Sequence, residues 1–366
     1  MLIDKINFPL FYNLIYFFTA FMVILSFISI EIKKDFIVQK KIGSFLVFIP
    51  LFLLIPLIGL REFDIGADTY TYYSNLWLIE REIDYSNEFL FTLLVNTLKN
   101  FNLSYSYFLF LVSSFFFCAI YSALKRVSSF YYSNVLYSFF AFFSFFFFLS
   151  MSINIIRQGA SLACLLLAYS YSLNKKIEIK TIFYMLLSLT LHLTSIISII
   201  LFVVSHKSIR YIKINYFYFL FLITIILSYM KFGLADISPF LIDILGDNKK
   251  VTYLGEEDFG YKVGFRPQFV IFNTLFLFIA IFVKSKILNN FWITRYSILI
   301  RYYILASCIF FMAFQLPFSD RWGLLSWVVI PLFFVPLFSS RDIKYGIKIH
   351  WIFILILIFI GFSFYG

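Results

Sequence analysis

The sequence predicts an all-α polytopic membrane protein, on the evidence of its composition and of its apolar runs. Hydrophobic residues make up 62% of the chain, charged residues only 13%, and the mean hydropathy is +0.92. Apolar runs follow one another almost from end to end, and no long polar linker separates them. Such a composition lies outside the range of soluble domains. We therefore expect a single transmembrane domain over residues 1–366.

About eleven apolar runs approach the length of roughly 20 residues that a spanning helix needs. The first run has no basic leader and no small-residue cleavage site, so it should remain as a helix. The Phe-rich stretch 139–149 is expected to face lipid. The runs lie near 7–30, 42–60, 103–124, 129–150, 153–173, 178–204, 212–230, 267–283, 296–317, 322–338 and 349–365.

Clusters of basic residues predict the orientation of these segments. The positive-inside rule places every cluster in the cytoplasm, but simple alternation of the spans puts 207–213 and the later clusters outside. If the chain breaks near Leu191 and His192 and returns to the side from which it entered, the later basic clusters also lie in the cytoplasm. The chain then has about twelve embedded segments. Taken alone, the run 178–204 also fits one ordinary spanning helix. The clusters are 33–41, 125–126, 175–180, 207–213, 284–295 and 341–348.

This orientation leaves two long outer loops, 61–101 and 231–266. Within the first loop, apolar residues of the stretch 88–101 recur at helical spacing opposite polar ones, which predicts an amphipathic helix in the outer interface. Its apolar face comprises Leu90, Phe91, Leu94, Leu98 and Phe101.

Several classes of partner and cofactor are not expected. The net charge of +11 comes from loops expected in the cytoplasm beside anionic lipid, so it does not indicate nucleic acid. The three cysteines lie in separate apolar runs, and the three histidines lack the spacing of paired metal ligands. Neither a disulfide framework nor a metal site is therefore expected.

Ionisable residues remain at helix ends on the expected outer side. A charge within the bilayer costs about 2.5–3.5 kcal/mol on insertion scales, which makes such residues functional candidates. Each of them alone also fits a purely structural role, such as a snorkelling anchor or a buried histidine whose hydrogen bonds are satisfied. The candidates are Arg61, Asp64, Asp68, Arg157, His192, Arg266, Asp320 and Arg321.

These residue types suit a phosphate-bearing substrate. Guanidinium groups make planar, permanently charged contacts to phosphate, and a neighbouring carboxylate can take a proton from an attacking hydroxyl. Small residues follow Arg157 in the stretch 158–161 and let a ligand or another helix come close. Arginines with a carboxylate at the outer edge of a bilayer therefore suit a lipid-linked diphosphate sugar.

Short motifs follow one another along most of the chain. They are GLREFDIGADTYTYY (59–73), NEFLFTLLVNTL (87–98), MSINIIRQGASLACLLLAYSY (151–171), LHLTSI (191–196), GFRPQFVIFN (264–273) and DRWGLLSWVVIPLF (320–333). In order and spacing these motifs resemble those of the EpsG/Wzy-type polysaccharide (O-antigen) polymerase family. In the first motif Gly66, Ala67 and Asp68 match the family pattern, with Tyr70 or Tyr72 as its tyrosine.

The resemblance implies a GT-C-like glycosyltransferase of the cytoplasmic (inner) membrane that works at the periplasmic face without a cofactor. Similar proteins join undecaprenyl-diphosphate-linked oligosaccharide repeat units, and a chain-length regulator protein is a further partner that the resemblance allows. Asp68, or Asp320 as second choice, would activate the acceptor hydroxyl, and His192 would orient acceptor or diphosphate. The residues implied to hold the diphosphate are Arg157, Arg321, Arg266 and Arg61.

A flippase or exporter of lipid-linked oligosaccharide is the main alternative, because it would share the membrane-embedded mass and the arginines. Such a protein is expected to show repeated halves, and no repeat is visible in the sequence. A membrane acyltransferase would place an acid or an arginine beside its catalytic histidine. His192 instead lies between Leu191 and Leu193.

Overall fold

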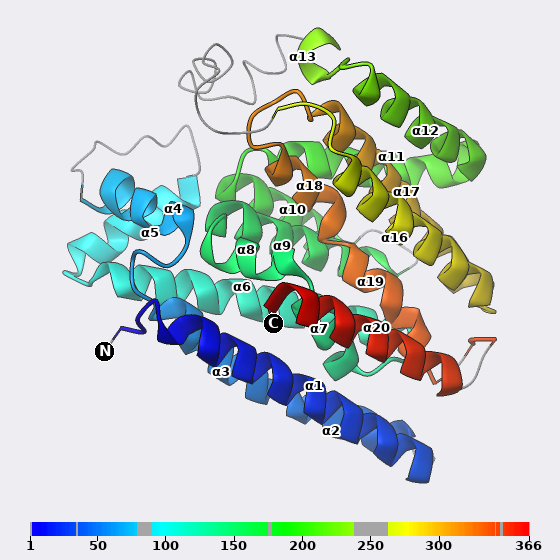
Figure 1. Ribbon diagram of the computed structural model, residues 1–366, viewed down its shortest axis with the longest axis horizontal. Coiled ribbons are helices and arrows are strands. Elements are labelled where there is room, and N and C mark those ends of the chain that lie inside the picture. Colours follow the sequence, from blue (N-terminus) through cyan, green and yellow to red (C-terminus); the bar gives the residue numbers. More distant parts are fainter. Residues whose placement is uncertain are drawn as a thin grey trace. The chain divides into compact units, whose positions relative to one another are not determined.

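The described part of the chain is helical. The computed structural model describes residues 2–33, 36–78, 89–174, 178–237, 263–340, 342–344 and 347–365. Besides the helices, isolated bridges join Ile3 with Arg61 and Ser133 with Ser339. The chain forms two compact units, Met1–Ser195 with Phe334–Gly366, and Ile196–Phe333 (Figure 1). The single domain expected over 1–366 stays a prediction.

The first unit is built around α9, which packs against both α6 and α10 (Figure 1). The Ser161 hydroxyl on α9 donates to the Ser188 carbonyl oxygen on α10 at 3.0 Å, which fixes the level at which these two helices meet. The unit contains α1 (Asn7–Lys33), α2 (Phe36–Leu46), α3 (Phe48–Gly59), α4 (Ala67–Tyr72), the π-helix η1 (Tyr73–Trp77), α5 (Phe89–Asn100), α6 (Tyr105–Phe130), α7 (Val135–Phe143), α8 (Phe146–Ile153), α9 (Ile156–Ser172), α10 (Ile179–Leu191), the 3-10 helix η3 (Val335–Phe338) and α20 (Ile347–Tyr365).

Six of the described helical segments are long and apolar enough to cross a membrane, which confirms the all-α polytopic class. They become seven if the bent pair α7 and α8 forms one span, while α10, α12 (Ile214–Tyr229) and residues 351–364 of α20 are apolar but shorter. Fewer full-length spans are described than the sequence predicts, because several apolar runs fold as short helices. The six are Asn7–Ser29, Lys41–Gly59, Tyr105–Phe130, Pro267–Lys286, Asn290–Met312 and Ser319–Phe338.

The run predicted as one span near 129–150 is broken. Asn134 begins α7 by accepting a hydrogen bond from the Leu136 N–H, and the axis turns by 80° between α7 and α8. At the turn Phe145 is extended, and the Ser144 hydroxyl donates to the Phe140 carbonyl oxygen at 2.8 Å.

The expectation that the Phe-rich stretch 139–149 faces lipid is wrong. Its rings pack on one another and on α1, as when Phe143 meets Tyr16 at 5.2 Å and Phe148 at 5.3 Å between ring centroids. The stretch therefore forms core of the first unit. Its fully buried rings are Phe139, Phe140, Phe142, Phe143, Phe145, Phe147 and Phe148.

The predicted break near His192 is present. Helix α10 ends at Leu191, His192 is extended with φ −159° and ψ 118°, and the next helix begins at Ser195. The break also coincides with the passage of the chain from the first unit to the second. That the chain returns there to the side from which it entered stays a prediction.

The amphipathic helix predicted over 88–101 is α5. Phe91 and Leu98 of the expected apolar face are buried, and Val95 is buried beside them, whereas Phe101 lies beyond the end of the helix and is 72% exposed. Of the two predicted outer loops, residues 79–88 and 238–262 lie outside the described residues.

The second unit is organised around the buried side chain of Asn273. Its amide donates to Ser307 and Ser326 hydroxyls at 2.9 and 3.2 Å, and its carbonyl oxygen accepts from the Trp327 indole at 2.8 Å. The Tyr303 hydroxyl donates to its backbone carbonyl oxygen. The unit contains α11 (Ser195–Tyr211), α12, α13 (Leu234–Ile237), α16 (Pro267–Lys286), α17 (Asn290–Met312), α18 (Ser319–Trp327) and most of α19 (Ile330–Phe334).

Replacing Asn273 by Leu should destabilise the second unit. The change leaves the Trp327 indole N–H and two hydroxyls without their buried partner, and each unsatisfied group costs about 1–3 kcal/mol. The thermal unfolding midpoint of the detergent-purified protein is expected to fall by several degrees. Asn290→Ala, at an exposed position that begins α17, is the control; equal midpoints for the two variants would contradict the role given to Asn273.

Candidate functional site

The candidate residues fall at helix ends in both units. Each group is described within its own unit. The first unit holds Arg61, Asp64, Asp68, Arg157 and His192, and the second holds Arg266, Asp320 and Arg321.

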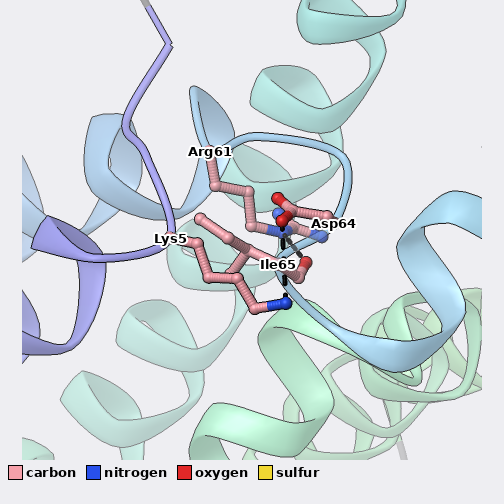
Figure 2. A network of polar contacts seen from close by, with 4 residues as sticks. All are labelled: Lys5, Arg61, Asp64 and Ile65. Carbon is pink, nitrogen blue, oxygen red and sulfur yellow. Dashed lines mark hydrogen bonds and ion pairs between the residues drawn. The ribbon is translucent and has the colours of Figure 1, made fainter.

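Arg61 is fully buried, and its guanidinium is surrounded by oxygen acceptors. Nε donates to the Ile65 carbonyl oxygen at 3.2 Å (Figure 2), and Nη1 donates to that of Ile58 at 2.5 Å. Nη2 donates to the Thr69 hydroxyl and to the Ile153 carbonyl oxygen, both at 3.0 Å. Burial lowers the pKa of Arg61 to about 10, so the group still carries its charge at neutral pH.

These bonds fasten the loop after α3 to the end of α8. The Thr69 hydroxyl donates to the Ile153 carbonyl oxygen at 2.9 Å, and the Ala67 N–H donates to the Asn154 side-chain oxygen at 2.9 Å. Between them Gly66 has φ +94°, and a Cβ placed there would lie 2.7 Å from the Ile153 oxygen. Arg61 therefore positions this loop in the structure, and its buried guanidinium offers no open face to a diphosphate.

Asp64 points away from this network. Its carboxylate lies 3.6 Å from Lys5 Nζ, and both side chains are more than half exposed. Figure 2 shows the ion pair between Asp64 and Lys5 and, separately, the bond from Arg61 to Ile65. Exposed pairs of this kind contribute little to stability.

Tyr72 connects Arg157 with helix α4, which carries Asp68. Asp68 and Tyr72 are four residues apart on α4, hence neighbours on one face of that helix. The Arg157 Cζ in the first turn of α9 lies 4.9 Å from the Tyr72 ring centroid, a cation–π distance. Both Asp68 and Arg157 are partly exposed. Helix α4 continues directly into the π-helix η1, a form that is frequent at functional sites.

His192 lies level with Arg157. The Ser161–Ser188 hydrogen bond pairs α9 with α10, and Arg157 is one turn before Ser161 while His192 is one turn after Ser188. The packing of the neighbouring residues supports this position of His192. One buried cluster contains Leu191, Ile156 and Tyr72. The structure thus brings Asp68, Arg157 and His192 to one end of the α9–α10 pair.

The second unit places its three candidates at one level. Arg266 is the N-cap of α16 and Asp320 lies in the first turn of α18; each is about two helical turns before the Asn273–Trp327 hydrogen bond. The Arg321 Cζ lies 4.8 Å from the Phe318 ring centroid, and Phe318 has a left-handed φ of 54°. Asp320 Oδ1 is buried and makes no hydrogen bond to the described residues.

Sequence reasoning missed the residues that hold these groups in place. Thr69 and Asn154 join the first motif to the third, and Asn273 joins the fifth to the sixth through Trp327. All of them lie inside the motifs already recognised in the sequence. Membership of a motif was therefore the signal by which these positioning residues could have been found. Among the described residues, no group of three His, Cys, Asp or Glu side chains is arranged to hold a metal ion.

Replacing Arg61 by Gln should loosen residues 61–66 and the following helix α4. The change removes the guanidinium donors from the Ile58 and Ile65 carbonyl oxygens, at about 1–3 kcal/mol for each unsatisfied group, while the Ile153 carbonyl oxygen keeps its bond from the Thr69 hydroxyl. Amide hydrogen exchange of 61–72 is expected to rise well above wild type. Arg210→Gln, at an exposed site in the last turn of α11, is the control. If the amides of 61–72 were as protected from exchange in Arg61→Gln as in wild type, the positioning role of Arg61 would be refuted.

Comparison with known proteins agrees with the motifs. Neither the curated proteins nor the solved structures include a significant match to this chain. The model of the EpsG family matches residues 44–366, which include every candidate residue in both units. Because that match covers most of the sequence, the chain belongs to the EpsG family.

Proposed function

We propose that this protein is a membrane glycosyltransferase that joins lipid-diphosphate-linked oligosaccharide repeat units into a polysaccharide. Membership of the EpsG family supports a polysaccharide-polymerase-like role. The observation that carries the proposal is the contact of Arg157 with the Tyr72 ring, one helical turn from Asp68 on α4, at the end of the α9–α10 pair where His192 lies. Asp68, Arg157 and His192 are each partly exposed, so a carboxylate, a guanidinium and an imidazole are accessible near that end.

The proposed reaction is a displacement at the sugar carbon that bears the diphosphate. The acceptor hydroxyl oxygen forms the new glycosidic bond while the bond to the diphosphate oxygen breaks, and the diphosphate leaves with the electron pair. Asp68 takes the hydroxyl proton, Arg157 stabilises the charge that develops on the diphosphate, and His192 orients the acceptor or the diphosphate. Asp320 is the second choice as base.

The remaining arginines differ in their suitability for the diphosphate. Arg266 and Arg321 are partly exposed at helix mouths of the second unit and are proposed to hold it. Arg61 is proposed as a positioning residue, because its donors are already bound to backbone and hydroxyl oxygens. We place the reaction at the periplasmic face of the inner membrane with an undecaprenyl-diphosphate-linked donor, as the charge pattern and the motifs suggest.

Asp68→Asn and Arg157→Ala should abolish polymerisation. Loss of a general base or of one charge-stabilising donor lowers rates by about 10²–10⁴. The measurement is a sugar-stained gel of the surface polysaccharide from a strain deleted for the gene and complemented with each variant, with expression checked in membranes. Long chains should collapse to a single repeat unit.

Matched controls are Asp342→Asn and Arg210→Ala, which alter exposed residues remote in sequence from every motif. Both should restore full-length chains. Absence of even the single repeat unit in the deletion strain would favour the flippase or an earlier transferase, and an unchanged ladder in the deletion strain would refute polymerisation of that polysaccharide.

Tyr72 should act through Arg157. Tyr72→Phe keeps the ring and should retain most of the activity, whereas Tyr72→Leu removes the cation–π contact, worth about 0.5–2 kcal/mol, and should shorten the chains. The comparison is made on the same gel, with hydrogen exchange of 67–72 to show that helix α4 remains folded. Equal activity of the two variants would mean that the ring does not position Arg157.

A further inference from the structure

The other end of the α9–α10 pair carries cations on aromatic rings. Arg126, near the end of α6, has its Cζ only 3.4 Å from the ring centroid of Tyr171 on α9. Lys180 Nζ, in the first turn of α10, lies 5.5 Å from the same ring. Lys125 Nζ lies 5.6 Å from the Tyr121 ring. Arg126 of α6 and Lys180 of α10 therefore converge on the Tyr171 ring, and Lys125 adds a positive charge next to Arg126 in the sequence.

Tyr171 is held in place by a second ring. Tyr184 of α10 stacks on it with centroids 5.5 Å apart and planes at 20°. Because α9 packs against both α6 and α10, the Tyr171 ring lies where these three helices meet. It can therefore fix the direction of the Arg126 guanidinium, which in a flexible surface loop would be spread over many rotamers.

This cluster lacks a counter-ion among the described residues. None of Lys125, Arg126 and Lys180 forms an ion pair there, and Arg126 Nε is buried without a hydrogen bond to any of them. The carboxylate nearest in sequence, Glu178, accepts a hydrogen bond from the Asn174 side chain. Like charges held close together repel, so the cluster is suited to an anion.

We propose that Lys125, Arg126, Lys180 and Tyr171 bind the phosphate group of an anionic phospholipid. The basic residues lie on the side that the positive-inside rule places in the cytoplasm, where the leaflet is anionic. A guanidinium held flat against a ring keeps its edge free for two parallel hydrogen bonds to phosphate oxygens. The proposal does not depend on the reaction at the opposite end of α9.

The test is a titration of the detergent-purified full chain with phosphatidylglycerol, followed by the thermal unfolding midpoint. Phosphatidylcholine serves as the neutral reference lipid and inorganic phosphate as the soluble anion. Wild type should be stabilised by phosphatidylglycerol alone. Lys180→Gln should weaken the apparent affinity about five-fold, as expected for one basic group at an anionic surface, and Arg126→Gln should weaken it further.

Arg210→Gln is the matched control, because Arg210 is exposed on the same predicted side and no aromatic ring is described against it. It should titrate like wild type. Lys180 is exposed as well, so its variant remains informative if Arg126→Gln does not fold. Three outcomes would each overturn the proposal. The Lys180→Gln variant could bind phosphatidylglycerol with the wild-type apparent affinity, the Arg210→Gln variant could lose as much affinity as Lys180→Gln, or inorganic phosphate could stabilise the protein as much as phosphatidylglycerol does.

Discussion

The placement of the candidate site depends on one buried guanidinium. Arg61 bonds to carbonyl oxygens of Ile58, Ile65 and Ile153, which belong to the end of α3, the following loop and the end of α8. The buried guanidinium of Arg61 forms no ion pair with a described carboxylate. It is stabilised because several backbone carbonyl dipoles accept its hydrogen bonds, and the loop holds these carbonyl groups in position. Asp68 lies in helix α4, which follows that loop, and Arg157 lies in the first turn of α9, just after Ile153. Both therefore take their positions from the same set of hydrogen bonds.

Two kinds of arginine can be separated on this basis. Arg61 and Arg301 are buried and bind backbone oxygens at helix ends; Arg301 donates to the Ser208 and Ile212 carbonyl oxygens near the end of α11. Such groups satisfy carbonyls that a helix end leaves without partners. Arg157, Arg266 and Arg321 are partly exposed and rest on aromatic rings. Because they are partly exposed, these are the arginines that a ligand can reach.

The sequence predicted the helical class, the break near His192 and the amphipathic helix α5, because each depends on local hydrophobic pattern or charge placement. It could not tell a lipid-facing phenylalanine from a buried one, since both satisfy the same hydropathy window. The 80° bend between α7 and α8 converts the stretch 139–149 from a span into core. Likewise Arg61 and Arg157 look alike in sequence, and only their neighbours in space distinguish a positioning group from an accessible one.

The two ends of α9 carry the proposed reaction site and the proposed lipid site. From Arg157 to Tyr171 the helix rises about 21 Å at 1.5 Å per residue, less than the roughly 30 Å of the hydrocarbon core. If the basic end is held at the level of phospholipid phosphates, Arg157 therefore lies near the middle of the bilayer and not at its opposite surface. A guanidinium at that depth costs about 2.5–3.5 kcal/mol on insertion scales unless it faces the protein interior or a water-filled cavity. The length of α9 thus predicts that a diphosphate would meet Arg157 in a recess below the outer surface, shielded from lipid by the protein.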